Sequence, residues 1–237
     1  MHPLQKALRQ QANKEKAIIL QKFFKTGEGE YAEGDIFLGL TVPQIRSTIS
    51  SFYELSLDDL ETLLHSKFHE ERLATLLILV HQFEKHPENR EDIFKFYLAN
   101  TQFINNWDIV DLSAHAIVGR FIFQEGKESP ELISTLQKLS SSHNLWERRI
   151  AIVSTYYFIK NNRFDETLHI AELLLNDKHD LIHNAGGGTL RDVGKQHIQV
   201  LKTLLKKNYT TMPRTMLRYA IERFPEKERK AYLLKSN

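Results

Sequence analysis

The sequence of 237 residues contains no cysteine. This absence excludes a disulfide scaffold, a cysteine nucleophile, thiolate zinc sites and iron–sulfur clusters. Proline and glycine are scarce, with 6 and 10 residues. Turn-rich sandwiches and barrels need more of both, so the composition favours a helical fold. Hydrophobic residues make up 41% and charged residues 26% of the chain, which is typical of a globular protein and excludes wholesale disorder.

Long apolar runs are also lacking. The longest apolar block, Leu76 to Val80, has five residues, far short of a membrane span. The residues after Met1 lack the apolar run of a signal peptide, so we expect a cytoplasmic protein. The net charge is only +2, so a basic surface can come only from the placement of charges.

What the sequence does contain is helical periodicity. Apolar residues recur at steps of three or four, which predicts helices over 3–24, 41–52, 56–65, 69–85, 89–99, 107–122, 129–140, 146–160, 164–175, 196–206, 213–223 and 226–235. The stretch 26–39 holds four of the ten glycines and predicts an inserted loop or small irregular hairpin. No linker divides the chain, so we expect a single domain over 1–237.

Polar residues recur near the starts of the predicted helices, at positions 72, 111, 149, 183 and 218, in steps of 39, 38, 34 and 35. Such periods predict a solenoid of about six helix pairs. Equivalent positions of a solenoid share a face, so we expect one surface that also receives neighbouring basic residues. Its predicted members are Arg72, Asp111, Arg149, His183 and Arg218, with Arg148, Arg191, Lys195 and Arg214. A basic groove suits a DNA backbone; ordinary solvated charges are the alternative.

One group of residues, from 107 to 111 and at 149, contains the side-chain types needed for catalysis. Trp107 and Asp111 are four residues apart and share a helix face, while Asp108 either lies one turn back from Asp111 or caps the helix. Arg149 falls one repeat later, so an indole, a carboxylate and a guanidinium would meet in the groove. The alternative is a helix cap, a core tryptophan and a salt bridge.

Metal and nucleotide motifs are weak. His65/His69 and His179/His183 are i,i+4 pairs, but the sequence has no HExxH motif, and we predict no metal site. The glycines 186–188 are not followed by the Lys-Ser/Thr of a phosphate-binding loop. Three glycines in a helix would bend it or let DNA backbone approach closely, which adds Gly187 and Gly188 to the predicted DNA contacts.

Residues from Leu4 to about Lys230 resemble the AlkD-like DNA alkylation repair family of HEAT-like repeat proteins. The segments that carry the resemblance are FFKTGEGEYAEGDIFLGL at 23–40, NNWDIVD at 105–111, NLWERRIAI at 144–152 and LRDVGK at 190–195. The resemblance implies an all-α, right-handed α-solenoid superhelix whose concave face holds duplex DNA.

It also implies an activity. The glycosylase members release N3- and N7-alkylated purines by hydrolysing the N-glycosidic bond, without metal or cofactor. By resemblance, Asp111 stabilises the sugar cation, Trp107 lies against the deoxyribose and Arg149 holds the neighbouring phosphate. We expect a monomer whose partner is duplex or branched DNA, located in the cytoplasm and at the nucleoid when it is bound to DNA.

The sequence departs from the glycosylase members at Gly188, where they have a second tryptophan. Two hypotheses follow. Either the chain is an alkylpurine glycosylase, or it is a non-catalytic protein that binds branched DNA by its structure, with the 26–39 loop reaching a junction. A protein scaffold is a third reading, because helical solenoids also bind peptides and helices.

Overall fold

The computed structural model describes residues 1–125 and 129–235. Across them the chain is all helical, which confirms the predicted fold class, and the sole β-type contact there is an isolated bridge between Ile36 and Phe68. Contacts divide the chain into two compact units, Met1–Ser113 (unit 1) and Ala114–Asn237 (unit 2). The handedness of a solenoid and the single domain stay predictions.

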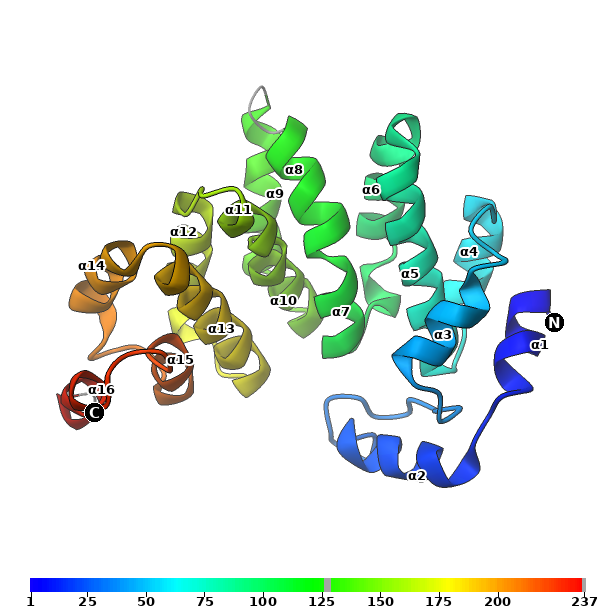
Figure 1. Cartoon of the computed structure of the whole chain (residues 1–237), viewed down its shortest axis with the longest axis horizontal. Coiled ribbons are helices and arrows are strands. Elements are labelled where there is room, and N and C mark those ends of the chain that lie inside the picture. Colours follow the sequence, from blue (N-terminus) through cyan, green and yellow to red (C-terminus); the bar gives the residue numbers. More distant parts are fainter. Residues whose placement is uncertain (126–128, 236–237) are drawn as a thin grey trace. The chain divides into compact units, whose positions relative to one another are not determined.

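Unit 1 is built around one long helix, α5 (Figure 1). Its helices are α1 (Pro3–Arg9), α2 (Lys14–Phe23), α3 (Val42–Ile49), α4 (Leu57–Leu64), α5 (His69–Lys85), α6 (Arg90–Ala99) and α7 (Trp107–Ser113). Helix α5 packs against α1, α3, α4, α6 and α7, and its first eleven residues are all buried. Side-chain caps begin the flanking helices: Asn13 accepts the Lys16 N–H and Ser56 accepts the Asp59 N–H. The predicted helix 3–24 is therefore two helices, separated at residues 10–13.

Residues 24–41 connect α2 to α3 without regular structure. Gly29, Gly34 and Gly39 have positive φ, a backbone region that glycine enters without strain. At Gly39 a Cβ would also lie 2.1 Å from the Asn13 carbonyl oxygen. The segment therefore packs closely against the start of α2.

Unit 2 contains α8 (Arg120–Glu125), α9 (Pro130–Ser140), α10 (Leu145–Ser154), α11 (Tyr156–Lys160), α12 (Asp165–Leu173), α13 (Asp180–Gln196), α14 (Ile198–Asn208), α15 (Arg214–Ala220) and α16 (Glu226–Lys235). A π-helical turn, His115–Gly119, precedes α8. The predicted helix 107–122 is thus interrupted. A Cβ on Gly119 would lie 2.1 Å from the Ser154 carbonyl oxygen, so this glycine lets the π-helical turn pack tightly on the end of α10.

The glycines at 186–188 have a packing role. Helix α13 runs through them without a break. A Cβ on Gly186 would lie 2.4 Å from the Met216 side chain, and one on Gly187 would lie 2.5 Å from the Met216 carbonyl oxygen. Both glycines therefore face α15 and permit its close packing against α13. Gly188 faces the Tyr156 hydroxyl instead, 3.2 Å from where a Cβ would stand.

Candidate DNA-contact and catalytic residues

Helix α7 begins at Trp107, and the chain before it fixes the position of the indole. The Asn106 side-chain oxygen accepts the Trp107 backbone N–H at 2.8 Å. The indole stacks on Phe24 at a centroid distance of 5.2 Å and meets the edge of Phe23 at 6.0 Å. Together with Ala17, Leu20 and Phe37, these contacts leave Trp107 partly buried. Trp107 is thus held on a rigid aromatic cluster with part of its surface open to solvent.

The Asp108 carboxylate pairs with a buried histidine of α5. This carboxylate lies 2.9 Å from Nε2 of His69, the first residue of α5, and Asp35 lies 3.3 Å from Nδ1 of the same ring. Arg72 donates to Asp35 at 2.6 Å. Two carboxylates and two cations thus form a buried, charge-balanced network, and Asp108 anchors α7 to α5.

The network changes the protonation of its members. Burial alone would lower the pKa of His69, but the charge of Asp108 and the hydrogen bonds to Asp108 and Asp35 raise this pKa to about 9. Burial alone would raise the pKa of Asp35, but the hydrogen bond from His69 and the charge of Arg72 lower it. His69 is therefore an imidazolium at neutral pH.

Asp111 has different surroundings from Asp108. It is half-buried, one helical turn further along α7. Burial, and additionally the negative charge of Asp111, raise the pKa of the nearby Tyr97 hydroxyl, which pairs with the Ser113 hydroxyl at 2.8 Å. Of the two acids on α7, Asp108 pairs with a buried histidine of α5, and Asp111, like Asp108, is half-buried.

The five repeat-equivalent residues occupy the fourth or fifth position of their helices α5, α7, α10, α13 and α15, which agrees with the predicted register. Their exposure differs. Arg72, Arg149 and His183 are 3%, 6% and 9% exposed, whereas Arg218 is exposed. Equivalent positions therefore do not share one solvent-exposed face.

Three of the predicted DNA contacts have a common structural task. Arg72 donates to the Ser66 carbonyl, Arg148 to the Ser142 carbonyl and His183 to the Asp177 carbonyl, each six residues back. Each side chain thus ties the first turn of its helix to the connection before it. Arg149 instead donates to the Leu181 carbonyl at the start of α13.

These bonds give Arg72, Arg148, Arg149 and His183 roles in the fold, and their predicted contacts with DNA stay predictions. The same holds for Gly187, which is buried under α15. Trp107 and Asp111 belong to unit 1 and Arg149 to unit 2. Their predicted meeting likewise stays a prediction.

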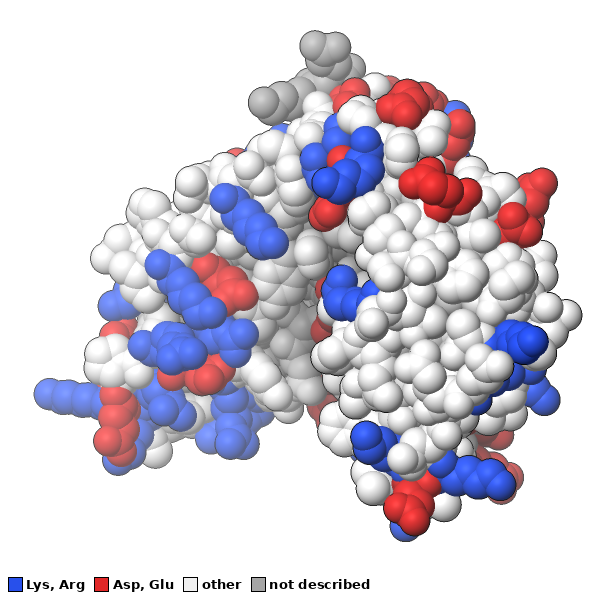
Figure 2. All heavy atoms as spheres, turned by 45° about the vertical axis from the view of Figure 1, so that its right-hand side comes forward, with Lys and Arg blue, Asp and Glu red and all other residues white. Residues whose placement is uncertain are grey.

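The remaining predicted DNA contacts lie at the surface of unit 2. Arg191 donates to Glu222 at 2.6 Å, and this hydrogen bond raises its pKa. Lys195 pairs with Asp192 at 2.5 Å, and Arg214 donates to the Leu233 carbonyl at 2.7 Å. Figure 2 shows Lys and Arg side chains gathered over the C-terminal helices, with acidic side chains among them.

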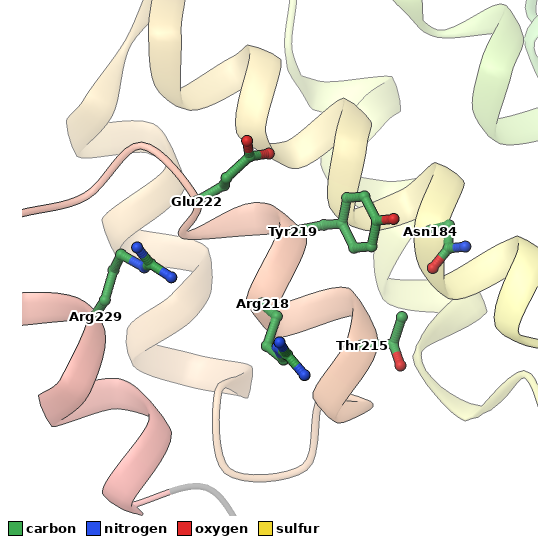
Figure 3. Close-up of a pocket in the computed structure, with 6 residues that line it drawn as sticks. All are labelled: Asn184, Thr215, Arg218, Tyr219, Glu222 and Arg229. Atoms are coloured by element: carbon green, nitrogen blue, oxygen red, sulfur yellow. The ribbon is translucent and has the colours of Figure 1, made fainter. Parts of the chain in front are cut away.

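A pocket of about 540 Å³ opens in this region. Arg218 and Thr215 enter it from α15, Asn184 from α13 and Arg229 from α16, and Tyr219 and Glu222 complete its wall (Figure 3). Among the described residues, the Arg218 and Arg229 side chains have no hydrogen-bond or ion-pair partner. Two unpaired guanidinium groups beside hydroxyl and amide donors suit a phosphate group. The sequence repeat identified Arg218, but Arg229 lies outside any repeat and was missed.

Over residues 1–125 and 129–235, no group of three or more His, Cys, Asp or Glu side chains is arranged to hold a metal ion. His65 of the first histidine pair lies near Asn100, and His69 lies in the network above. Within that same part of the chain, no helix combines the length and the apolar character needed to cross a bilayer.

Comparison with known proteins gave a family match. The model of the family described as DNA alkylation repair enzyme matches residues 4–224. No curated protein matched the chain. A solved structure titled as a predicted DNA alkylation repair enzyme from Enterococcus faecalis superposes with a TM-score of 0.71 at 16% identity, over 91% of this chain and 98% of that one.

Two structures from Streptococcus mutans are also similar. AlkD2 superposes with a TM-score of 0.55 at 18% identity, over 90% of this chain and 99% of its own. The protein smu.31 of strain UA159 superposes with a TM-score of 0.55 at 16% identity, over 92% of this chain and 100% of its own. At these identities the superpositions show a shared fold. They agree with the resemblance that the sequence motifs indicated.

Proposed function

Since this chain belongs to the DNA alkylation repair enzyme family, we propose that it binds alkylated duplex DNA and hydrolyses the N-glycosidic bond of N3- and N7-alkylated purines. The observation that carries this proposal is the division of roles on α7. Trp107 is held by the aromatic cluster and Asp108 by His69, while Asp111 lies one turn further along the helix and is half-buried. A carboxylate on an anchored helix beside an indole is suited to a sugar that becomes cationic.

The reaction needs little help at the leaving group. Alkylation makes the purine cationic, so when the C1′–N bond breaks its electron pair neutralises the base, which departs without prior protonation. Positive charge then develops at C1′ and O4′ of the sugar. The Asp111 carboxylate stabilises this charge and accepts a hydrogen bond from the attacking water. The water oxygen bonds to C1′ and its proton is released. Trp107 packs against the deoxyribose and fixes its distance from Asp111.

Affinity for DNA comes from the basic side chains of unit 2. Arg218 and Arg229 are exposed in the pocket between α13, α15 and α16, and we assign them to backbone phosphates. Each phosphate that they neutralise releases condensed counterions. Replacing both with Gln should reduce the salt dependence of binding, so that the slope of log K against log salt becomes smaller in magnitude by about 1.8.

The proposal is tested by release of 3-methyladenine and 7-methylguanine from methylated duplex DNA. We expect the parent to release both bases, and Asp111→Asn to slow release by about a hundredfold or more. Asp92→Asn is the matched control, because Asp92 is an exposed acid on α6 of the same unit. Equal release by the parent and Asp111→Asn would remove Asp111 from catalysis.

One observation favours a second function. Position 188 is a glycine and presents no aromatic side chain; the Tyr156 hydroxyl lies near it instead. A non-catalytic protein selective for branched DNA needs no second aromatic contact with the sugar. Absence of base release by the parent, together with tighter binding of a four-way junction than of a duplex, would establish this alternative.

A further inference from the structure

Helix α2 exposes apolar side chains to an unusual degree. Ile18, Ile19 and Phe23 are 57%, 65% and 61% exposed. Ile19 and Phe23 are four residues apart and share one face of the helix. The opposite face is buried through Ala17, with Leu20 beside it. Single exposed apolar residues are common on protein surfaces, but three on one ten-residue helix form a patch.

The same helix carries basic residues. Lys14, Lys16 and Lys22 lie on α2, and Lys25 follows it; all four are exposed. Among the described residues, none of them has an ion-pair partner. Glu15 is the sole acid of the helix. Segment 14–25 therefore carries a net charge of +3 within a chain whose total is +2, and this local charge complements a polyanion.

The patch adjoins the proposed active residues. Phe23 meets the edge of Trp107 at a centroid distance of 6.0 Å and an interplanar angle of 70°. The two rings thus form a corner, with Phe23 the more exposed member. The base of this corner is rigid because Phe24 stacks on both Trp107 and Phe37.

We infer that α2 is a second DNA-contacting element, in which Phe23 and Ile19 pack on the deoxyribose edges beside the lesion while Lys16 and Lys22 bind the flanking phosphates. This inference rests on the proposed function in one respect, that DNA is the ligand; it does not require base excision. Aromatic contact with nucleotides tolerates any sequence, which suits a repair protein that must scan DNA. A membrane surface fits less well, because α2 spans only ten residues and buries its other face in unit 1.

The test measures binding of an unmodified fluorescent duplex by anisotropy at several NaCl concentrations. We expect Phe23→Ser and Ile19→Ser each to weaken binding about tenfold at every salt concentration. The double variant Lys16→Gln/Lys22→Gln should instead weaken the salt dependence, so that the slope of log K against log salt becomes smaller in magnitude by about 1.8. Ile19→Ser keeps the test decisive should Phe23→Ser disturb Trp107.

Lys85→Gln is the matched control. Lys85 is an exposed lysine at the end of α5, about 24 Å along that helix from His69, and its replacement should leave both affinity and slope unchanged. If the α2 variants bind duplex as the parent does while the parent excises bases, the inference is wrong and the proposed function stands. If they lose binding although the parent excises nothing, the inference stands without the glycosylase. Normal duplex binding with lost sedimentation on phosphatidylserine vesicles would assign α2 to lipid and overturn the inference.

Discussion

Raising the pH above neutrality should destabilise unit 1 through His69. The pKa of this buried imidazole moves from an ordinary value of 6.5 to about 9 in the folded chain. Because the folded state then holds the proton more tightly than the unfolded state does, its stabilisation is complete below pH 6.5. It is lost as the pH rises through 9. A shift of this size corresponds to about 3 kcal/mol of unfolding free energy, a large fraction of the stability of a typical domain.

Urea unfolding between pH 6 and 10 measures this effect. The chain has two tryptophans, Trp107 in unit 1 and Trp146 in unit 2, so a Trp146→Phe background makes the fluorescence report on unit 1. We expect the unfolding free energy to fall by about 3 kcal/mol from pH 6.5 to 9.5. His69→Gln should be less stable at pH 6.5 and should lack this fall. An equal fall in both proteins, or a flat profile in the parent, would refute the assignment of the proton to His69.

Two further predictions concern glycine packing and a buried acid. Gly187→Ala should destabilise unit 2 by about 1–3 kcal/mol, because its Cβ would lie 2.5 Å from the Met216 carbonyl oxygen. Gly188→Ala should cost less than Gly187→Ala, because its Cβ would lie 3.2 Å from a side-chain hydroxyl, that of Tyr156, and not against backbone; thermal melts compare the two. The Glu70 carboxylate accepts the N–H groups of residues 38, 39 and 40 at 2.8, 2.8 and 3.1 Å. Glu70→Ala should therefore cost about 3 kcal/mol or more and expose segment 26–40 to protease, whereas Glu70→Gln, which keeps one acceptor oxygen, should cost less.

The helices were predictable where their signals are local. The expected helix at 69–85 coincides with α5, and α7 begins at Trp107, where the predicted helix 107–122 begins. The break between α1 and α2 and the π-helical turn were not predicted. Gly119 by itself does not predict a π-helical turn, because the close packing that it permits is against the Ser154 carbonyl of another helix.

Side-chain orientation at the repeat positions was not predictable for a related reason. Arg72 is buried because its partner Asp35 comes from a loop 37 residues away, and His69 binds Asp108 across 39 residues. Periodicity places such a residue on its helix but gives no information about a distant partner. One signal was available: four polar residues, HEER, directly before the mostly apolar run LATLLILV of the same helix. In a buried helix such a run indicates that each polar side chain has a specific partner.

The first turn of α5 joins segments that the ribosome produces at very different times. Glu71 binds Arg9 of α1, 62 residues earlier in the sequence. Glu70 binds the backbone of residues 38–40, and His69 pairs with Asp108, which is synthesised later. At 5–20 residues per second, α1 is synthesised about 3–12 s before Glu71 exists to hold it. Nascent chains that end before Asp108 leave His69 without its closer carboxylate. Unit 1 therefore completes its folding only once nearly all of its own sequence has left the ribosome.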